Sequence, residues 1–113
     1  MKTAVIIVPT YNEAGNIKNL IDQLFIVLKT ITKWDVHVMV VDSSSPDKTD
    51  ELVEQMRTTY PKLHLITAKK EGLGKAYVHG FTHAIEKLNP YVLFEWMRIF
   101  PMIPKRFPIS WKK

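Results

Sequence analysis

Residues 4–13 read Ala-Val-Ile-Ile-Val-Pro-Thr-Tyr-Asn-Glu, a run of five apolar residues followed by a polar segment. Four of the five apolar residues are β-branched, and the run is too short for a buried helix. A strand without polar alternation is typical of the centre of a parallel sheet, where both faces are covered. The sequence therefore predicts a parallel strand over residues 4–8 that ends at Pro9, with residues 10–13 in the loop beyond it.

Strand and helix patterns alternate along the chain after this first strand. Apolar residues recur at helical spacing over residues 13–28, and the strand pattern returns at residues 36–41. Ser45 and Pro46 form an N-cap and a first-turn proline, which predicts a helix to about Thr59. A third strand, a third helix and a fourth strand are predicted at residues 63–67, 75–88 and 91–95.

The order βαβαβαβ predicts an α/β fold of the Rossmann-like kind, with a mostly parallel sheet and helices on both faces. Ligands of such sheets bind beyond the carboxyl ends of the strands. In this chain these positions are residues 9–13, 42–48, 68–74 and whatever follows Glu95. We expect the chemistry of the protein in these loops.

Composition and charge indicate an ordinary globular protein with one unusual end. The chain has 16 basic and 11 acidic residues and no cysteine, and no apolar run is long enough to span a membrane. The segment after Glu95 contains five bases and no acid, so the preceding part of the chain carries as many acids as bases. We therefore expect a soluble chain in the cytoplasm or at the cytoplasmic face of a membrane.

The first two loops carry side chains suited to a nucleotide. Tyr11 can stack on a base and Glu13 can accept its N–H donors, although Asn12 and Glu13 would equally suit the cap of the following helix. Asp42 ends a buried strand with a carboxylate, which suits a ribose or base contact. Asp42 could instead cap a turn, but Ser45 already supplies a cap.

The third loop has a weaker pattern. Gly72 and Gly74 permit close backbone approach at the start of a helix, and Lys75 adds positive charge there, which together suit a phosphate. Two glycines before a helix are also typical of a plain turn. His79 and His83 stand four apart on the helix and could share a metal, but a surface or packed pair is the simpler interpretation.

Three motifs together resemble one family. PTYNE at residues 9–13, VVDSSSPDKT at residues 40–49 and EGLGKAYVHGF at residues 71–81 have the order and spacing of the family 2 glycosyltransferases. Over about residues 3–95 the chain resembles the start of the GT-A domain of the dolichol-phosphate (polyprenol-phosphate) mannosyltransferase group. The resemblance and the loop chemistry together predict contacts with a nucleotide sugar at Pro9, Tyr11, Glu13, Val41, Asp42, Ser43, Gly74 and Lys75.

The chain departs from the family's pattern in two places. The family usually has two acids in a row where this chain has Asp42 and Ser43, so the base contact of the second acid is not carried over. After the fourth strand the family has an acidic motif of the DxD type that holds Mg²⁺ or Mn²⁺ against the donor diphosphate, whereas this chain has Trp96, Met97 and Arg98. We therefore expect no catalytic residue and no bound metal in this chain.

A one-base shift in reading frame would explain the departure after the fourth strand. Suitable codons for residues 96–113, with one base added in front, encode MDADFSHDPKAISHFLEK, which contains the missing DAD motif. Trp96 and Met97 have one codon each and leave little freedom. We expect residues 1–95 to be the N-terminal nucleotide-binding part of a GT-A domain and residues 96–113 to be an aberrant, frameshifted tail. The alternative is a native basic segment that contacts anionic membrane.

By resemblance, the parent enzyme transfers mannose or another hexose from a nucleotide sugar such as GDP-mannose to dolichyl or polyprenyl phosphate, with inversion. The chain itself is expected to be truncated and inactive, with weak nucleotide affinity. A non-catalytic nucleotide-binding module is one alternative. A membrane or nucleic-acid binder that uses the basic tail is another, but the neutral body disfavours it. The expected partners are thus the nucleotide-sugar donor and, for the intact enzyme, a polyprenyl-phosphate acceptor at the membrane, with no nucleic acid.

Overall fold

The computed structural model of the 113-residue chain describes residues 1–96. Strands and helices alternate strictly along these residues, which confirms the predicted βαβαβαβ order. The elements are β1 (Lys2–Thr10), α1 (Ile17–Leu28), β2 (Trp34–Asp42), α2 (Thr49–Met56), β3 (Leu63–Thr67), α3 (Leu73–Leu88) and β4 (Val92–Glu95).

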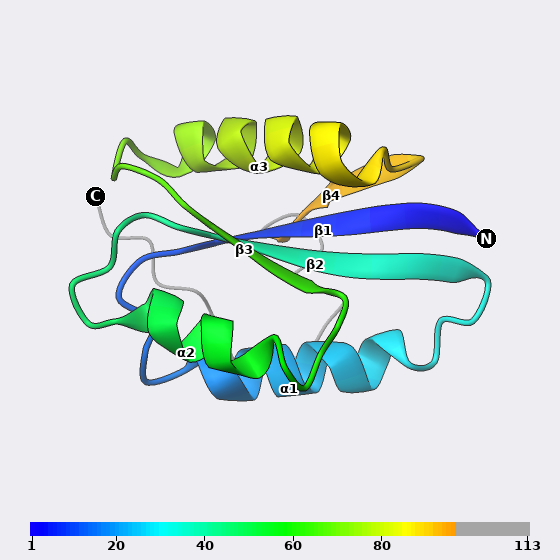
Figure 1. Cartoon of the computed structure of the whole chain (residues 1–113), viewed down its shortest axis with the longest axis horizontal. Helices are drawn as coiled ribbons and strands as arrows, with labels where there is room; N and C mark the ends of the chain where they lie inside the picture. The colour runs from blue at the N-terminus through cyan, green and yellow to red at the C-terminus, as the bar shows by residue number, and fades with distance from the viewer. Residues whose placement is uncertain (97–113) are drawn as a thin grey trace.

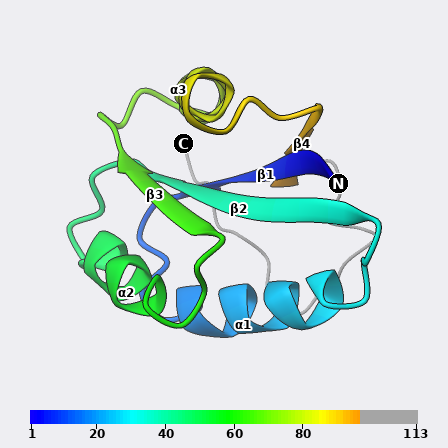
Figure 2. The ribbon, with the colours of Figure 1, turned by 45° about the vertical axis from the view of Figure 1, so that its right-hand side comes forward.

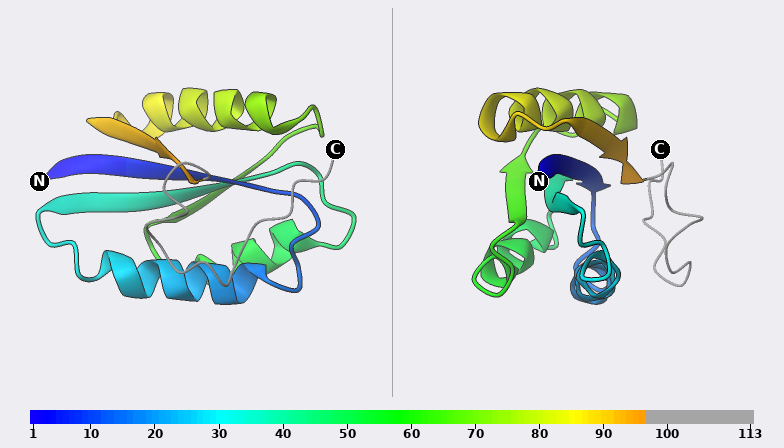
Figure 3. Two further views of the ribbon diagram at one scale, coloured as in Figure 1. Left: turned by 180° about the vertical axis from the view of Figure 1, so that it is seen from behind. Right: turned by 90° about the vertical axis from the view of Figure 1, so that its right-hand side faces the viewer.

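The four strands form one parallel sheet in the order β3-β2-β1-β4. Helices α1 and α2 cover one face of this sheet and α3 covers the other, as Figures 1 and 2 show. The same three layers are visible from behind and from the side in Figure 3. The α/β fold with a parallel sheet and helices on both faces is therefore as predicted.

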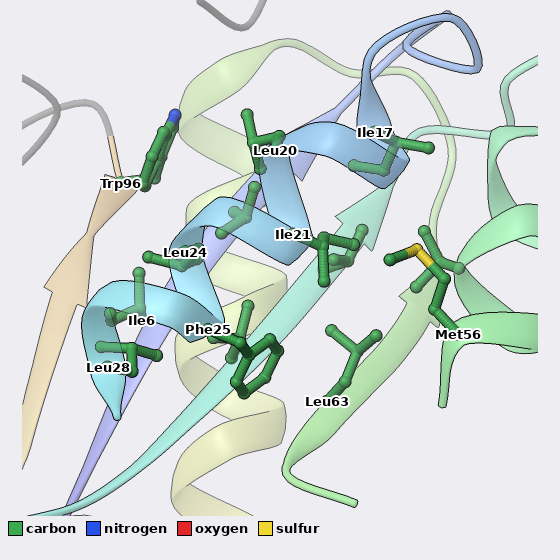
Figure 4. Packing of buried hydrophobic residues seen from close by; sticks show 14 residues of the cluster. Ile6, Ile17, Leu20, Ile21, Leu24, Phe25, Leu28, Met56, Leu63 and Trp96 are labelled. Carbon is green, nitrogen blue, oxygen red and sulfur yellow. The ribbon is translucent and has the colours of Figure 1, made fainter. Parts of the chain in front are cut away.

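Alternation along the central strand builds two cores. Ile6 and Val8 of β1 face α1 and α2, where they join a cluster that includes Leu24, Val40 and Met56. Figure 4 shows how side chains from α1, α2 and the strands meet in this cluster. The odd-numbered residues of β1 face α3 instead, in a second cluster whose buried members are Val5, Ile7, Met39, Val41, Ala76, Tyr77 and Ala84. Both faces of β1 are thus apolar, as its unbroken hydrophobic sequence requires.

Strand β1 continues beyond its predicted end. The sequence predicted a stop at Pro9, but β1 runs to Thr10, with Pro9 paired in register with Val41 of β2. Strand β1 pairs with β4 only as far as Ile7 and Glu95. On the β4 side, Pro9 therefore lies beyond the paired part of β1. A proline has no N–H to donate, and it is tolerated in a strand where one side needs no ladder bond.

Both predicted helix starts in the first half of the chain are wrong. Helix α1 begins at Ile17 rather than residue 13, and the Glu13 carbonyl accepts the N–H groups of Asn16 (2.9 Å) and Ile17 (2.8 Å). Helix α2 begins at Thr49 rather than at Pro46, after Lys48 in a left-handed conformation (φ 66°). The Ser45 hydroxyl is bonded elsewhere, to Asp42 and Asn12, so it does not cap α2. The Ser45-Pro46 pattern is typical of a helix cap, but the tertiary structure uses Ser45 to join two loops. The predicted start of α2 at Pro46 failed for this reason.

The described chain ends in the α1–α2 core. Trp96 follows β4 directly and is buried in the cluster shown in Figure 4, although the sequence assigned it to the tail. The remainder of the predicted tail, residues 97–113, lies outside the described residues, and the frameshift stays a prediction. Within residues 1–96, no helix combines the length and the apolar character that crossing a bilayer would require.

Candidate functional site

The loops that follow β1, β2 and β3 meet at one edge of the sheet, because parallel strands present their carboxyl ends together. These loops comprise residues 11–16, 43–48 and 68–72. All three lie on the left of the molecule in Figure 1, at the end of α3 where that helix begins. We call this region the loop edge.

Asp42 is the centre of the loop edge. It is fully buried, and its carboxylate accepts hydrogen bonds from the Thr10 hydroxyl (2.8 Å), the Ser45 hydroxyl (2.6 Å) and the Ser45 backbone N–H (2.9 Å). The backbone carbonyl of Asp42 also accepts from the Ala68 N–H at 2.9 Å. Asp42 therefore ties the ends of β1, β2 and β3 together, and it also makes the turn that the sequence offered as an alternative.

Backbone N–H groups of the first loop bond to side chains of the segment after β2, and we call these contacts the junction. Successive N–H groups of the first loop donate to side chains that follow β2, and all of these bonds are close to 3 Å. The bonds run from Asn12 to Ser45 Oγ (2.9 Å), from Glu13 to Thr49 Oγ1 (3.0 Å) and from Ala14 to Asp47 Oδ2 (3.0 Å). The backbone of Asn12 has a positive φ of 55° in this loop, a conformation that asparagine tolerates.

Asp47 takes part in this junction as an anion. Burial acts to raise the pKa of its carboxyl, but hydrogen bonds from the Thr49 hydroxyl and from the Ala14 N–H outweigh that effect and lower it. The Thr49 hydroxyl donates to Asp47 Oδ1 at 2.5 Å, next to the Thr49 N–H at 3.1 Å. The lowered pKa keeps Asp47 charged, and the junction keeps the first turn of α2 beside the β1 loop.

Tyr11 and Glu13, in the first loop, lie in different environments. The Tyr11 ring is half-exposed, and Lys70 of the third loop places its ammonium 3.8 Å from the ring centroid. The Glu13 residue is buried, with only 3% of its surface exposed. The loop edge thus combines a partly accessible aromatic ring with a carboxylate that is shielded from solvent.

Ser43 stands where the family pattern has a second acid. It is 1% exposed, its N–H donates to the Thr10 carbonyl at 3.0 Å, and its hydroxyl finds no hydrogen-bond partner among residues 1–96. Val41, two residues earlier, is buried beside Pro9 of β1. The loop edge therefore has a neutral hydroxyl at this position, which can donate as well as accept.

Gly74 and Lys75 occupy the first turn of α3, and both are exposed. Gly72 precedes the helix with φ +96°, a conformation that favours glycine, and its carbonyl accepts the Ala76 N–H at 3.1 Å. A Cβ at Gly74 would meet no atom within 4 Å, so the described packing does not require glycine there. Among residues 1–96, no hydrogen bond, ion pair or ring contact links Gly74 or Lys75 to Tyr11 or Asp42.

The two helix histidines line a cavity that borders the third loop of the loop edge. A cavity of about 750 Å³ lies between β3 and α3, and His79, His83, Glu71 and Glu86 are among the residues that line it. His79 lies 3.6 Å from the Glu71 carboxylate. No set of three histidine or acidic side chains among the described residues is placed to hold a metal ion. The residues present at this cavity therefore do not fit a metal centre.

The position of the family's acidic motif is equally unsuited to a metal. Strand β4 ends at Glu95, and the next residue, Trp96, is buried in the α1–α2 core. The sequence then continues with Met97 and Arg98, and no acid follows. The described residues at the end of β4 do not fit a divalent cation.

Sequence reasoning missed the residues that hold the loop edge together. They are Thr10, Ser45 as a link between loops, Asp47, Thr49 and Lys70. Serine, threonine and aspartate after a strand are ordinary cap and turn residues, so their composition alone carried no signal for contacts with a loop 30 residues earlier. In the sequence, Lys70 offers only a positive charge, which does not predict its contact with the Tyr11 ring.

Comparisons with known proteins agree with this geometry. Residues 5–94 match the family described as Glycosyl transferase family 2. The chain is similar to the dolichol-phosphate mannosyltransferase of Pyrococcus furiosus, with 36% identity over 84 residues that cover 74% of this chain and 23% of the relative. It is also similar to the polyprenol monophosphomannose synthase of Mycolicibacterium smegmatis, with 32% identity over 85 residues, or 74% of this chain and 30% of the relative.

A third relative and a solved structure extend the comparison. The undecaprenyl-phosphate mannosyltransferase of Micrococcus luteus is 33% identical over 82 residues, which cover 72% of this chain and 32% of the relative. The solved structure is the mannosyltransferase PcManGT of Pyrobaculum calidifontis in complex with GDP-Man and Mn²⁺. It superposes with a TM-score of 0.60 at 30% identity, over 74% of this chain and 24% of that chain. The present chain spans about a quarter to a third of the length of these relatives.

Proposed function

Because this chain belongs to glycosyl transferase family 2, we propose that its loop edge binds the nucleotide part of a nucleotide sugar, with GDP-mannose as the first candidate. The observation that carries the proposal is the junction at Asp42, which brings the predicted residues of the first two loops to one place. A structural relative that shares the fold at 30% identity is in complex with GDP-Man and Mn²⁺, which supports this choice of donor.

Each side chain of the junction has a role that its geometry allows. Tyr11 offers a half-exposed ring on which a base can stack. Asp42 already accepts three hydrogen bonds through its side chain, and a carboxylate has room for about four. A ribose hydroxyl or a base N–H that reaches this buried carboxylate would find one acceptor position left. Glu13 supplies a second, buried carboxylate in the first loop.

The diphosphate belongs at the start of α3 in this proposal. The first turn of a helix leaves N–H groups without helical partners, and the helix dipole favours an anion there. Gly74 leaves space in front of this turn, and Lys75 adds a positive charge. Gly74 and Lys75 would thus hold the phosphates while Tyr11 and Asp42 hold the nucleoside.

The proposed reaction of the parent enzyme is mannosyl transfer to a polyprenyl phosphate at the membrane, as the names of the curated relatives suggest. The acceptor phosphate is already an anion, so it needs little general-base help, and positioning of the donor matters most. The part of this reaction that we propose for the present chain is to bind and orient the donor. We propose a location in the cytoplasm or at the cytoplasmic face of the membrane, where a polyprenyl-phosphate acceptor of the kind named for the relatives would be reached.

Calorimetric titration with GDP and GDP-mannose tests the proposal. We expect measurable binding, and Tyr11→Ala should weaken it about three- to tenfold because the stacking surface is lost. Tyr91→Ala is the control, since Tyr91 is likewise a tyrosine under a lysine ammonium (Lys2, 4.1 Å) but directly precedes β4, away from the loop edge. Equal affinities for the wild type and Tyr11→Ala would remove the β1 loop from the site.

A further inference from the structure

Lys70 is a charged residue of the loop edge to which neither the motifs nor the proposed site gives a role. It lies in the loop between β3 and α3, two residues before Gly72. The base of this loop is fixed, because the Ala68 N–H donates to the Asp42 carbonyl (2.9 Å) and the Ala68 carbonyl accepts from the Ser44 hydroxyl (2.7 Å). Lys70 therefore follows two residues after an anchored point of its loop.

The Lys70 ammonium has one contact in the described part of the chain, which is the face of Tyr11. The distance from Nζ to the ring centroid is 3.8 Å, and Lys70 forms no salt bridge within residues 1–96. The nearest acid in sequence, Glu71, lies beside His79 instead. A contact between a solvated ammonium and a ring is weaker than a charge-assisted contact with a phosphate, so it is easily exchanged for the stronger one.

A base that stacks on Tyr11 competes with the ammonium for the same ring. The face covered by Lys70 becomes available only if the side chain moves away. A nucleoside diphosphate brings its own anion, and a lysine ammonium is attracted far more strongly to a phosphate than to an aromatic ring. The base can therefore displace Lys70 from the ring while the phosphates of the same ligand receive it.

We propose that Lys70 is a diphosphate-binding residue of this site, which covers Tyr11 when the site is empty and moves to the phosphates when a nucleoside diphosphate stacks on the ring. The inference rests on the proposed nucleotide site and adds a selection rule to it. Lys70 favours ligands with two phosphates and opposes binding of the bare nucleoside. It thus tunes the site to the diphosphate part of a nucleotide-sugar donor.

Titration of the 113-residue chain with guanosine, GMP and GDP, followed by NMR, tests this exchange. Lys70→Ala should weaken GDP binding about tenfold, because a charge-assisted contact is lost. The same variant should bind guanosine at least as well as the wild type, and up to about fivefold more tightly, since no ammonium has to leave the ring. Lys70→Arg should restore GDP binding, because arginine both stacks on rings and binds phosphate.

Lys69→Ala is the matched control, because it removes an equal charge from the adjacent exposed position. It should leave the preference for GDP over guanosine unchanged. If Lys69→Ala and Lys70→Ala lost GDP affinity equally, the effect of Lys70 would be only that of a nearby positive charge, and the inference would be overturned. Equal loss of guanosine and GDP affinity in Lys70→Ala would also overturn it, because Lys70 would then only hold the Tyr11 ring in place. No binding of GDP by the wild type would overturn the proposed nucleotide site and this inference with it, whereas the first two outcomes leave that site intact.

Discussion

Gly80 determines how closely helix α3 approaches the sheet. A Cβ at this position would lie 2.6 Å from Cγ2 of Ile7 and 2.9 Å from Cγ2 of Val41, closer than carbon atoms can pack. Both neighbours belong to the core between α3 and the sheet. Since Val41 is also one of the predicted nucleotide contacts, Gly80 links the packing of α3 to the floor of the candidate site.

We expect Gly80→Ala to lower the free energy of unfolding by about 1–3 kcal/mol, because the added methyl group forces side chains or the helix to move. Urea denaturation measures this change. Gly74→Ala is the control in the same helix, since its Cβ would meet nothing within 4 Å. It should raise stability by up to about 1 kcal/mol through the higher helix propensity of alanine. Equal stability of the two variants would mean that α3 can leave its close contact at no cost.

At the scale of elements, β2 and β3 are joined by a chain of polar groups on the α3 side of the sheet. His37 Nδ1 lies 2.9 Å from His64 Nε2, and His37 Nε2 lies 3.0 Å from Asp35 Oδ2. Burial lowers the pKa of His64, and the charges of His37, Arg57 and His83 lower it further. When both rings of the pair are protonated, neither can accept the hydrogen bond between them.

This pair makes stability depend on pH near neutrality. The pKa of His64 is lower in the folded protein than its ordinary value of 6.5, so the folded state binds fewer protons than the unfolded chain. The contribution of His64 to stability is complete above pH 6.5 and is lost as the pH falls through the lowered pKa of the folded state. We expect the melting temperature of the wild type to fall between about pH 7.5 and about pH 5, and that of His64→Gln to fall less. Thermal unfolding followed by circular dichroism measures both.

His79→Gln is the control for the pH experiment, because His79 is exposed on α3 and faces Glu71 rather than the strand pair. It should keep the pH dependence of the wild type. A His64→Gln profile that follows the wild type throughout this pH range would assign the dependence to other groups.

At the scale of the whole molecule, the candidate site is one-sided. The loops after β1, β2 and β3 supply groups for the nucleoside and the phosphates, whereas β4 ends at Glu95 and the buried Trp96. The sequence after Glu95 contains no acid that could hold a cation against the donor diphosphate. We therefore propose that it binds a donor without completing the transfer.

The 113-residue chain should show no detectable mannosyl transfer when it is assayed with Mg²⁺, GDP-mannose and a polyprenyl phosphate. The loss of electrostatic stabilisation of the leaving diphosphate costs several kcal/mol of transition-state stabilisation. The comparison protein carries the restored reading frame from codon 96 onward and should be active. Transfer by the 113-residue chain at a rate near that of the restored protein would contradict the proposal. DNA that contains no family-like continuation in the restored frame would contradict the frameshift.

The sequence by itself determined the order of the elements and the edge of the sheet at which the candidate site lies. The β-branched runs and the helical spacing are local patterns, and the limits predicted for β3, residues 63–67, agree with the structure. Parallel strands joined by helices then leave one edge for the loops, so Tyr11, Glu13 and Asp42 were placed near one another without coordinates.

Only the tertiary structure decided how these loops are held and what covers them. Ser45 and Pro46 form a sound cap pattern, yet Ser45 bonds Asp42 and the backbone of Asn12, and α2 starts at Thr49. The ammonium of Lys70 lies over the ring of Tyr11, although the two residues belong to loops far apart in the chain. Such contacts depend on where distant segments meet. A serine or a lysine has several partners of similar energy in its own neighbourhood, and packing of the whole sheet selects among them.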